Sequence, residues 1–511
     1  MSLIERLHPR QAGILLHPTS LPGPHGIGDL GSAAHAWLDW LATSGCTLWQ
    51  VLPLGPTGYG DSPYQSLSSF AGNPLMISPE ELIQDGLLDA HDLDPRPASP
   101  PGRVDFGEVI VHKDRLLALA SARFRQRASQ DLQDLYDSFC ADQAEWLEDF
   151  ALFVALKRSL RGLAWTQWPE ELSGRNPEAL RQAAASLSAE IAEHRLRQFL
   201  FDRQWQAVHH RAQELGIAII GDIPIFVAHD SADVWAAPQL FYLRSDGESE
   251  VVAGVPPDYF SPTGQLWGNP LYRWPAHRAD GFAWWIRRFR SVLRSVDVVR
   301  LDHFRGFDAY WEIPGGAPTA EKGRWVPGPG PALLEAARDD LGGLPIIAED
   351  LGFITPGVKE LRDSFDLPGM KVIQFAFGGD PDDDFLPHNY RPRCVVYTGT
   401  HDNDTTRGWY TTAPEAEQDY CRRYLARDGN DISWDLLRVA WSSVADWAIA
   451  PLQDVLDLGT EGRMNFPGRP QGNWGWRFFA SDLTPGLASR LLELNDLFGR
   501  RPRTSDETSA T

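Results

Sequence analysis

Cysteine and long apolar runs are both scarce in this sequence, and each shortage excludes a class of protein. The four cysteines of the 511-residue chain have no C-x-x-C spacing and lie at Cys46, Cys140, Cys394 and Cys421. Neither a disulfide framework nor a zinc site is therefore indicated. No apolar run reaches the ~20 residues that a membrane helix needs, and the opening MSLIERLHPRQ lacks the features of a signal peptide. We expect a cytoplasmic protein with no membrane partner.

Positive charge is also in short supply. Lysine and arginine number 47 against 69 acidic residues, which gives a net charge of −22. Such a chain repels phosphate backbones, so nucleic acid is not an expected partner. The content of 43% hydrophobic and 23% charged residues is typical of a folded globular protein. Tryptophan, by contrast, is abundant at 20 residues, and its flat apolar face suits both a large core and the stacking of sugar rings.

Short apolar runs rich in branched residues recur along the chain and predict strands that are buried on both faces, as in a parallel sheet. Helical patterns precede several of them, which indicates repeated βαβ units. No G-x-G-x-x-G follows the first run, so a closed (β/α)8 barrel is favoured over an open Rossmann sheet. The expected strands lie at 13–20, 47–55, 217–226, 296–304, 344–352, 370–378 and 394–404, with an eighth near 473–479.

We expect one (β/α)8 domain over residues 1–500 and a flexible tail at 501–511. The long interval between the second and third strands holds amphipathic helical stretches such as 108–128 and 147–160. It is interpreted as a mostly helical insertion at about 75–210 that grows out of a barrel loop. A separate second domain is the alternative.

Acidic residues follow four of the expected strands at their carboxyl ends, which is where a barrel of this class carries its catalytic residues. For two of them, Asp350 and Asp404, a helix cap is an equally good explanation. The full set is Asp222, Asp302, Glu349, Asp350, Asp402 and Asp404.

The segment RLDHFRG places a guanidinium beside one of these acids. Strand side chains alternate faces, so Arg300 and Asp302 point the same way at the barrel rim. A neighbouring guanidinium favours the ionised form of a carboxylate, which a nucleophile requires. A buried salt bridge that only fixes the loop is the alternative. Clustered carboxylates with many aromatics and no metal-ligand pattern indicate glycosidic-bond chemistry, which needs no cofactor and no metal.

Four motifs carry a resemblance to a known family: GDIPIFV around Asp222, RLDHFRG around Asp302, IIAEDLG around Glu349 and GTHDNDT around Asp402. They resemble the barrel motifs of the 4-α-glucanotransferases called amylomaltases or disproportionating enzymes, glycoside hydrolase family 77, a branch of the α-amylase superfamily. The likeness extends over HPTSLPGPHGIGDLG, GPTGYGDSPYQSLSSFAGNP and GVPPDYFSPTGQLWGNPLY, at 17–31, 55–74 and 254–272.

The resemblance implies a role for each matching residue. Asp302 would be the nucleophile, Glu349 the general acid/base and Asp402 the third carboxylate, which holds sugar hydroxyls. The segment at about 250–275 would be a lid-like loop over the cleft. Substrate-binding residues would be Tyr59, Asp222, Asp258, Tyr259, Phe260, Trp267, Asn269, Arg300, His303, His401 and Asn473.

The implied reaction moves an α-1,4-glucan segment from a donor onto the 4-hydroxyl of glucose or a maltooligosaccharide with retention, and makes cyclic glucans when the acceptor is the chain's own end. The expected partners are α-1,4-glucans, maltooligosaccharides and glucose, with no obligate protein partner. Two alternatives stay open. An α-amylase-like retaining hydrolase would use the same three acids, and a non-catalytic glucan-binding protein could have a degenerate barrel.

Overall fold

The computed structural model describes residues 10–98, 100–257, 261–469 and 471–501. Its centre is a closed barrel in which neighbouring strands pair in the order β1-β12-β11-β10-β9-β6-β3-β2. Every neighbouring pair is parallel, as the prediction of a (β/α)8 barrel requires. The strands are β1 Gln11–Leu15, β2 Leu48–Gln50, β3 Ala218–Ile223, β6 Val298–Leu301, β9 Ile346–Ala348, β10 Gly369–Val372, β11 Cys394–Tyr397 and β12 Trp447–Pro451.

The prediction of an eighth strand at 473–479 was wrong. That strand is β12, which pairs with β1 from Gln11↔Trp447 to Leu15↔Pro451 and so closes the barrel. Two features of the sequence account for this wrong prediction. In 473–479 the buried aromatics Trp474, Trp476 and Phe478 alternate as they would on a strand, while β12 reads WAIAP, whose small alanines do not stand out as a branched apolar run.

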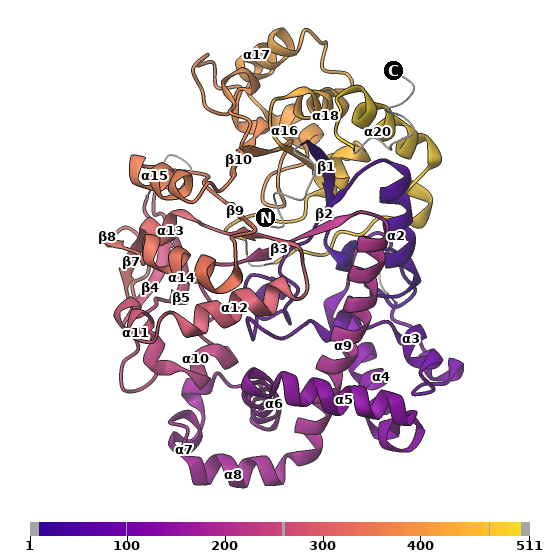
Figure 1. Cartoon of the computed structure of the whole chain (residues 1–511), viewed down its shortest axis with the longest axis vertical. Coiled ribbons are helices and arrows are strands. Elements are labelled where there is room, and N and C mark those ends of the chain that lie inside the picture. The colour runs from indigo at the N-terminus through magenta and orange to yellow at the C-terminus, as the bar shows by residue number, and fades with distance from the viewer. Residues whose placement is uncertain (1–9, 99, 258–260, 470, 502–511) are drawn as a thin grey trace.

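Helices follow the strands around the barrel (Figure 1). They are α2 Ser32–Thr43, α10 Ala232–Ala236, α11 Trp274–Ala279, α12 Ala283–Leu293, α13 Arg305–Asp308, α14 Pro331–Leu341, α15 Pro356–Ser364, α16 Thr406–Thr412, α17 Glu415–Leu425, α18 Ile432–Ser442, α19 Leu452–Val455 and α20 Pro485–Leu497. Within the described residues, none of the helices is both long and apolar enough to cross a membrane.

The chain between β2 and β3 forms a helical layer beside the barrel, at the bottom of Figure 1. Helix α9 runs from this layer back to the barrel, where it leads into β3. The layer comprises α3 Pro79–Gln84, α4 Phe106–Arg127, α5 Gln130–Asp142, α6 Ala144–Ser159, α7 Glu170–Ser173, α8 Pro177–Ser186 and α9 Ser188–Glu214.

A second, antiparallel sheet stands beside the barrel, with strand order β5-β4-β7-β8. Its strands are β4 Val251–Val255, β5 Gln265–Pro270, β7 Ala309–Pro314 and β8 Arg324–Pro327. The segment expected to be a lid-like loop at about 250–275 therefore contains two paired strands, and β7 follows α13 directly. The part of this segment around β4 and β5 is consequently fixed to the body of the protein by sheet hydrogen bonds.

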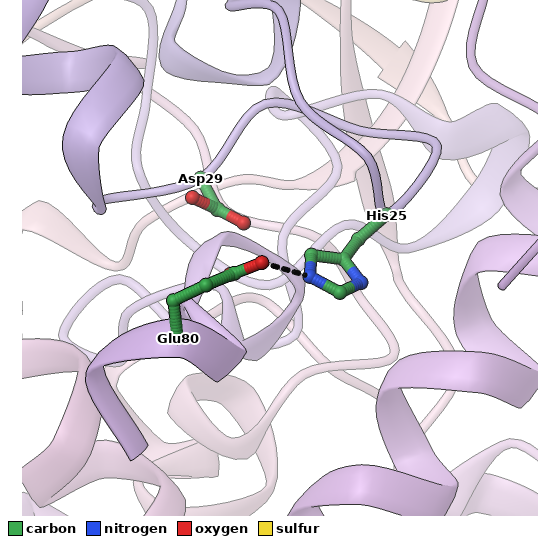
Figure 2. A group of neighbouring side chains, drawn as sticks. All are labelled: His25, Asp29 and Glu80. Carbon is green, nitrogen blue, oxygen red and sulfur yellow. Dashed lines mark hydrogen bonds and ion pairs between the residues drawn. The ribbon is translucent and has the colours of Figure 1, made fainter. Parts of the chain in front are cut away.

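A buried cluster of polar side chains joins the helical layer to the loop after β1 (Figure 2). His25 binds Glu80 of α3, with 2.9 Å between Nε2 and Oε1, and its Nδ1 lies 3.0 Å from Nε2 of His112 on α4. Lys113 of α4 is fully buried and donates to Asp29 Oδ2 at 3.4 Å and to a main-chain carbonyl at 2.7 Å. Each buried charge in the cluster thus has a partner of opposite sign or a hydrogen bond.

Lys113→Met should destabilise the protein strongly, because it leaves the buried Asp29 carboxylate without its cation. Removing one partner of a buried pair costs about 3–5 kcal/mol. Thermal or urea unfolding should show the loss, and the exposed Lys322→Met is the matched control. The double variant Lys113→Met with Asp29→Asn should recover part of the stability. An unchanged midpoint in the single variant would contradict the proposed importance of the pair.

Candidate active site

The carboxyl ends of β3 and β6 are joined by one buried guanidinium. Arg300 is 3% exposed and contacts both Asp222, with 2.7 Å between Nη1 and Oδ2, and Asp302, with 2.9 Å between Nη2 and Oδ1. Tyr64 adds a hydroxyl donor to Asp222 Oδ2 at 2.8 Å. Burial raises the pKa of Asp222, and the positive charge of Arg300 offsets part of that rise. The paired side chains hold Asp302 in one orientation at the barrel mouth, where it stays partly exposed.

Glu349 stands at the end of β9, the neighbour of β6 in the barrel. Burial raises its pKa well above the usual range, and the nearby negative charge of Asp302 adds to the rise while Arg300 opposes it. Its Oε2 accepts the backbone N–H of His303 at 2.7 Å. A carboxyl group whose pKa is raised beside a second carboxylate is the arrangement that supplies a general acid.

His303 makes this hydrogen bond from a strained backbone. Its φ of 50° lies in the left-handed region, which a non-glycine residue adopts at some cost in energy. This conformation allows its N–H to reach Glu349, while the next residue, Phe304, donates its own N–H to the Glu349 carbonyl at 3.0 Å. The turn after β6 therefore fixes the position of the carboxyl group after β9.

Asp402 lies in the loop after β11, where Asn465 and Arg463 hold it in place. Asn465 donates to its Oδ1 at 2.6 Å, and Arg463 donates to its main-chain carbonyl at 2.7 Å. The neighbouring His401 is 6% exposed, with Nε2 at 3.4 Å from Asp402 Oδ2. Burial lowers the pKa of His401. The imidazole is therefore neutral at neutral pH, so it can both donate and accept a hydrogen bond.

Tyr64 connects the two halves of the mouth, although the sequence reasoning did not select it. Its ring stacks on His401 with 5.2 Å between centroids and lies 5.7 Å from the Trp474 ring. Its pKa is raised well above the usual range by burial and by the charge of Asp222, and Asp302 and Asp402 contribute. Tyr64 lies in the quoted motif GPTGYGDSPYQSLSSFAGNP, which was the one available signal. No comparable signal in the sequence marks Asn465.

The antiparallel sheet brings two of the predicted substrate-binding residues to this region. Trp267 on β5 meets the His303 ring edge-on at 4.8 Å. Asn269, also on β5, is buried and donates to the Val227 carbonyl in the loop after β3 at 2.8 Å. Trp267 is thus next to the turn that carries Asp302, whereas the Asn269 amide group anchors the sheet to the barrel.

Other predicted residues have structural contacts or lie outside the described part. Asn473 accepts the Phe466 N–H at 2.9 Å and donates to the Arg469 carbonyl at 2.8 Å, so its amide holds the loop that contains it. Tyr59 begins the short 3-10 helix Tyr59–Asp61, but its side chain is not described. The predictions for Asp258, Tyr259 and Phe260 fall on residues outside the described ranges.

The remaining strand-end acids, Asp350 and Asp404, are bound to the surrounding scaffold. Asp350 pairs with Arg362 of α15 and accepts the Met370 N–H of β10 at 2.7 Å. Asp404 accepts the Thr460 hydroxyl at 2.8 Å and the N–H of the next residue. Neither acid is the helix cap that was the alternative explanation, because Thr355 and Thr405 are the N-caps of α15 and α16. Both acids nevertheless have structural contacts.

Two groups of side chains in the described residues bring three metal-binding atoms within 4.8 Å of one another. In each group a cation from the protein already pairs with one of the carboxylates. Lys113 binds Asp29 in the first group, and Arg123 binds Asp92 in the second. The groups are His25, Asp29 and Glu80 (Figure 2) and Asp89, His91 and Asp92.

Comparison with known proteins agrees with this geometry. The model of the 4-alpha-glucanotransferase family matches residues 16–481. A 4-alpha-glucanotransferase of Thermus thermophilus is 52% identical over 94% of this chain and 97% of its own. The chloroplastic/amyloplastic 4-alpha-glucanotransferase of Solanum tuberosum is 47% identical over 96% of this chain and 85% of its own.

A solved structure also matches nearly the whole chain. The amylomaltase from Streptococcus agalactiae, in complex with acarbose, superposes with a TM-score of 0.94 at 38% identity, covering 96% of this chain and 100% of that one. Family model, sequence relatives and solved structure therefore agree over the barrel, the helical layer and the antiparallel sheet. The chain belongs to the 4-alpha-glucanotransferase family, glycoside hydrolase family 77.

Proposed function

We propose that the protein is a 4-α-glucanotransferase that moves α-1,4-glucan segments onto the 4-hydroxyl of glucose or a maltooligosaccharide. The observation that carries the assignment of residues is the contact of Arg300 with Asp302 beside a Glu349 whose pKa is raised well above its usual range. This pair places a carboxyl group held by a guanidinium beside a carboxyl group with a raised pKa within one site. Membership of the family supports transfer rather than hydrolysis as the outcome.

The reaction proceeds in two displacements. An Asp302 carboxylate oxygen attacks the anomeric carbon, the bond from that carbon to the 4-oxygen breaks, and the Glu349 proton moves to the departing 4-oxygen. Glu349 is then a carboxylate and takes the proton from the 4-hydroxyl of the acceptor. That oxygen attacks the anomeric carbon, and the bond to Asp302 breaks. Two inversions give net retention, and an acceptor at the other end of the same chain gives a cyclic glucan.

The other residues of the mouth hold the sugar ring. Asp402, fixed by Asn465, presents a carboxylate to sugar hydroxyls, and the neutral His401 can donate to one of them. Trp267 offers an apolar face beside the turn that carries Asp302. The predicted residues Tyr59, Asp258, Tyr259 and Phe260 are proposed to contact glucan as well, on the strength of the family likeness alone.

Maltotriose distinguishes the proposed function from the hydrolase alternative. The wild type should convert it to glucose plus longer oligomers, which chromatography separates, whereas a hydrolase gives only shorter products. Asp302→Asn should lower turnover by more than ~10⁴-fold, because an amide cannot attack the anomeric carbon. Binding of maltooligosaccharides should survive, which shows that the variant is folded. A variant with a tenth of wild-type turnover would exclude Asp302 as the nucleophile.

Glu349→Gln tests the acid separately. Turnover of maltotriose should fall ~10²- to 10⁴-fold, because the amide has no proton to give. A glycosyl fluoride donor should still form the glycosyl-enzyme, since fluoride leaves without protonation. In the wild type, kcat/KM for maltotriose should fall on the alkaline side as Glu349 loses its proton, and the raised pKa places this fall above pH 4.5. Equal losses with both donors would contradict the assignment.

Trp267→Ala tests how the glycosyl-enzyme favours a sugar over water. We propose that the indole face binds the acceptor ring, so its removal should raise the ratio of hydrolysis to transfer several-fold. New reducing ends report hydrolysis, and free glucose from maltotriose reports total turnover. Trp267→Phe, which keeps an aromatic face, is the matched control. An unchanged ratio in Trp267→Ala would show that the ring only packs the sheet against His303.

A further inference from the structure

Two exposed aromatic rings meet at Arg305, which lies in the segment after β6, and take no part in the mechanism above. Phe353 is 73% exposed and Trp325 is 36% exposed. Arg305 lies between them, with its guanidinium carbon 3.7 Å from the Trp325 ring centroid and 5.3 Å from that of Phe353. These three residues are called the Phe353–Trp325 platform.

The platform is built from three elements that meet on one side of the barrel. Phe353 is in the loop between β9 and α15, Trp325 is on β8, and Arg305 begins α13. Figure 1 shows β8, α13 and α15 close together at the left of the barrel. Arg305 also donates from Nη1 to the Phe353 main-chain carbonyl, which ties the loop to α13. The platform is therefore held in place before any ligand arrives.

Single exposed apolar side chains are common and need no explanation. This pair differs because a buried arginine positions both rings. Arg305 is only 6% exposed, and its guanidinium stacks over Trp325, whose ring also meets Trp311 edge-on at 5.2 Å. Trp325 is thus braced on one face and along one edge while part of its surface stays open. A braced aromatic surface loses little entropy when a ligand binds.

Two of the platform residues follow the proposed nucleophile and acid closely along the chain, which is the basis for assigning the platform to the leaving-group side. Arg305 comes three residues after Asp302, and Phe353 comes four residues after Glu349. In the proposed mechanism Glu349 protonates the departing oxygen, so the chain that leaves, and the acceptor that replaces it, lie on the Glu349 side. The loop that begins at Glu349 leads from this position to Phe353.

We propose that the Phe353–Trp325 platform is an additional binding site for the distal glucose units of a long α-1,4-glucan on the acceptor side. The inference rests on the proposed function. The apolar faces of sugar rings stack on aromatic rings, and the buried Arg305 holds the two rings in fixed positions for such stacking. The platform therefore favours long acceptors without affecting glucose or maltose.

The test uses the Asp302→Asn variant, which binds glucans without turnover, and measures the affinity for maltotriose and for maltoheptaose by calorimetry. Adding Phe353→Ala should weaken maltoheptaose binding about tenfold, as loss of an aromatic stacking surface does. Maltotriose binding should not change. Phe353→Tyr should restore the affinity. Phe479→Ala, which removes a ring that is 51% exposed and adjacent to Gly102, is the matched control.

Three outcomes would overturn the inference. These are no loss for maltoheptaose, an equal loss for both oligosaccharides, and a wild-type dimer that Phe353→Ala converts to a monomer while glucan binding stays intact. The last would assign the platform to a second copy of the chain. Failure of the proposed function is separate, because a wild type that only hydrolyses maltotriose would refute transfer and leave the dependence on chain length standing.

Discussion

The site depends on the contacts that Arg300 makes with two carboxylates. Its guanidinium is buried at the ends of two adjacent strands and touches one carboxylate from each, Asp222 and Asp302. A buried cation is tolerated only when it is paired and hydrogen-bonded, so both acids must stay in contact with Arg300. A lysine in its place would contact one acid at a time, because it lacks the planar fork that allows two contacts. The position of the nucleophile in the proposed mechanism is thereby fixed by charge pairing rather than by packing alone.

The same cation gives the acids of the mouth different surroundings. Asp302 has a direct contact with Arg300, whereas Glu349 has none and is hydrogen-bonded by a backbone N–H instead. Burial and the charge of Asp302 then raise the pKa of Glu349. The surroundings of Glu349 thus raise its pKa, as is usual for the acid in a site that also holds a nucleophilic carboxylate. The strained turn at His303 links the two acids, because it follows Asp302 and binds Glu349.

The barrel and its strand-end acids could be predicted from the sequence because both depend on local patterns. Buried parallel strands are continuous apolar runs, and an acid after such a run is visible in the sequence. β12 was missed because its burial relies on small alanines that fit between neighbours, a property of the packing rather than of the run itself. Asn465 was missed for a related reason, since it meets Asp402 across 63 positions of sequence and no local pattern marks it. The motif likeness supplied what local patterns could not, namely the division of roles among the acids.

A preference for transfer over hydrolysis must come from elements outside the barrel. The acids come from strand ends, whose spacing the barrel fixes, so they would serve hydrolysis and transfer equally. What differs is the competition between water and a sugar hydroxyl at the glycosyl-enzyme, and this depends on surfaces that bind the acceptor and exclude water. The surfaces proposed for this role lie on the antiparallel sheet, where Trp267 contacts the turn after Asp302 and Trp325 is braced by Arg305. Both contacts join the sheet to residues within three positions of His303, so the proposed acceptor surfaces and Asp302 are positioned by the same short segment after β6.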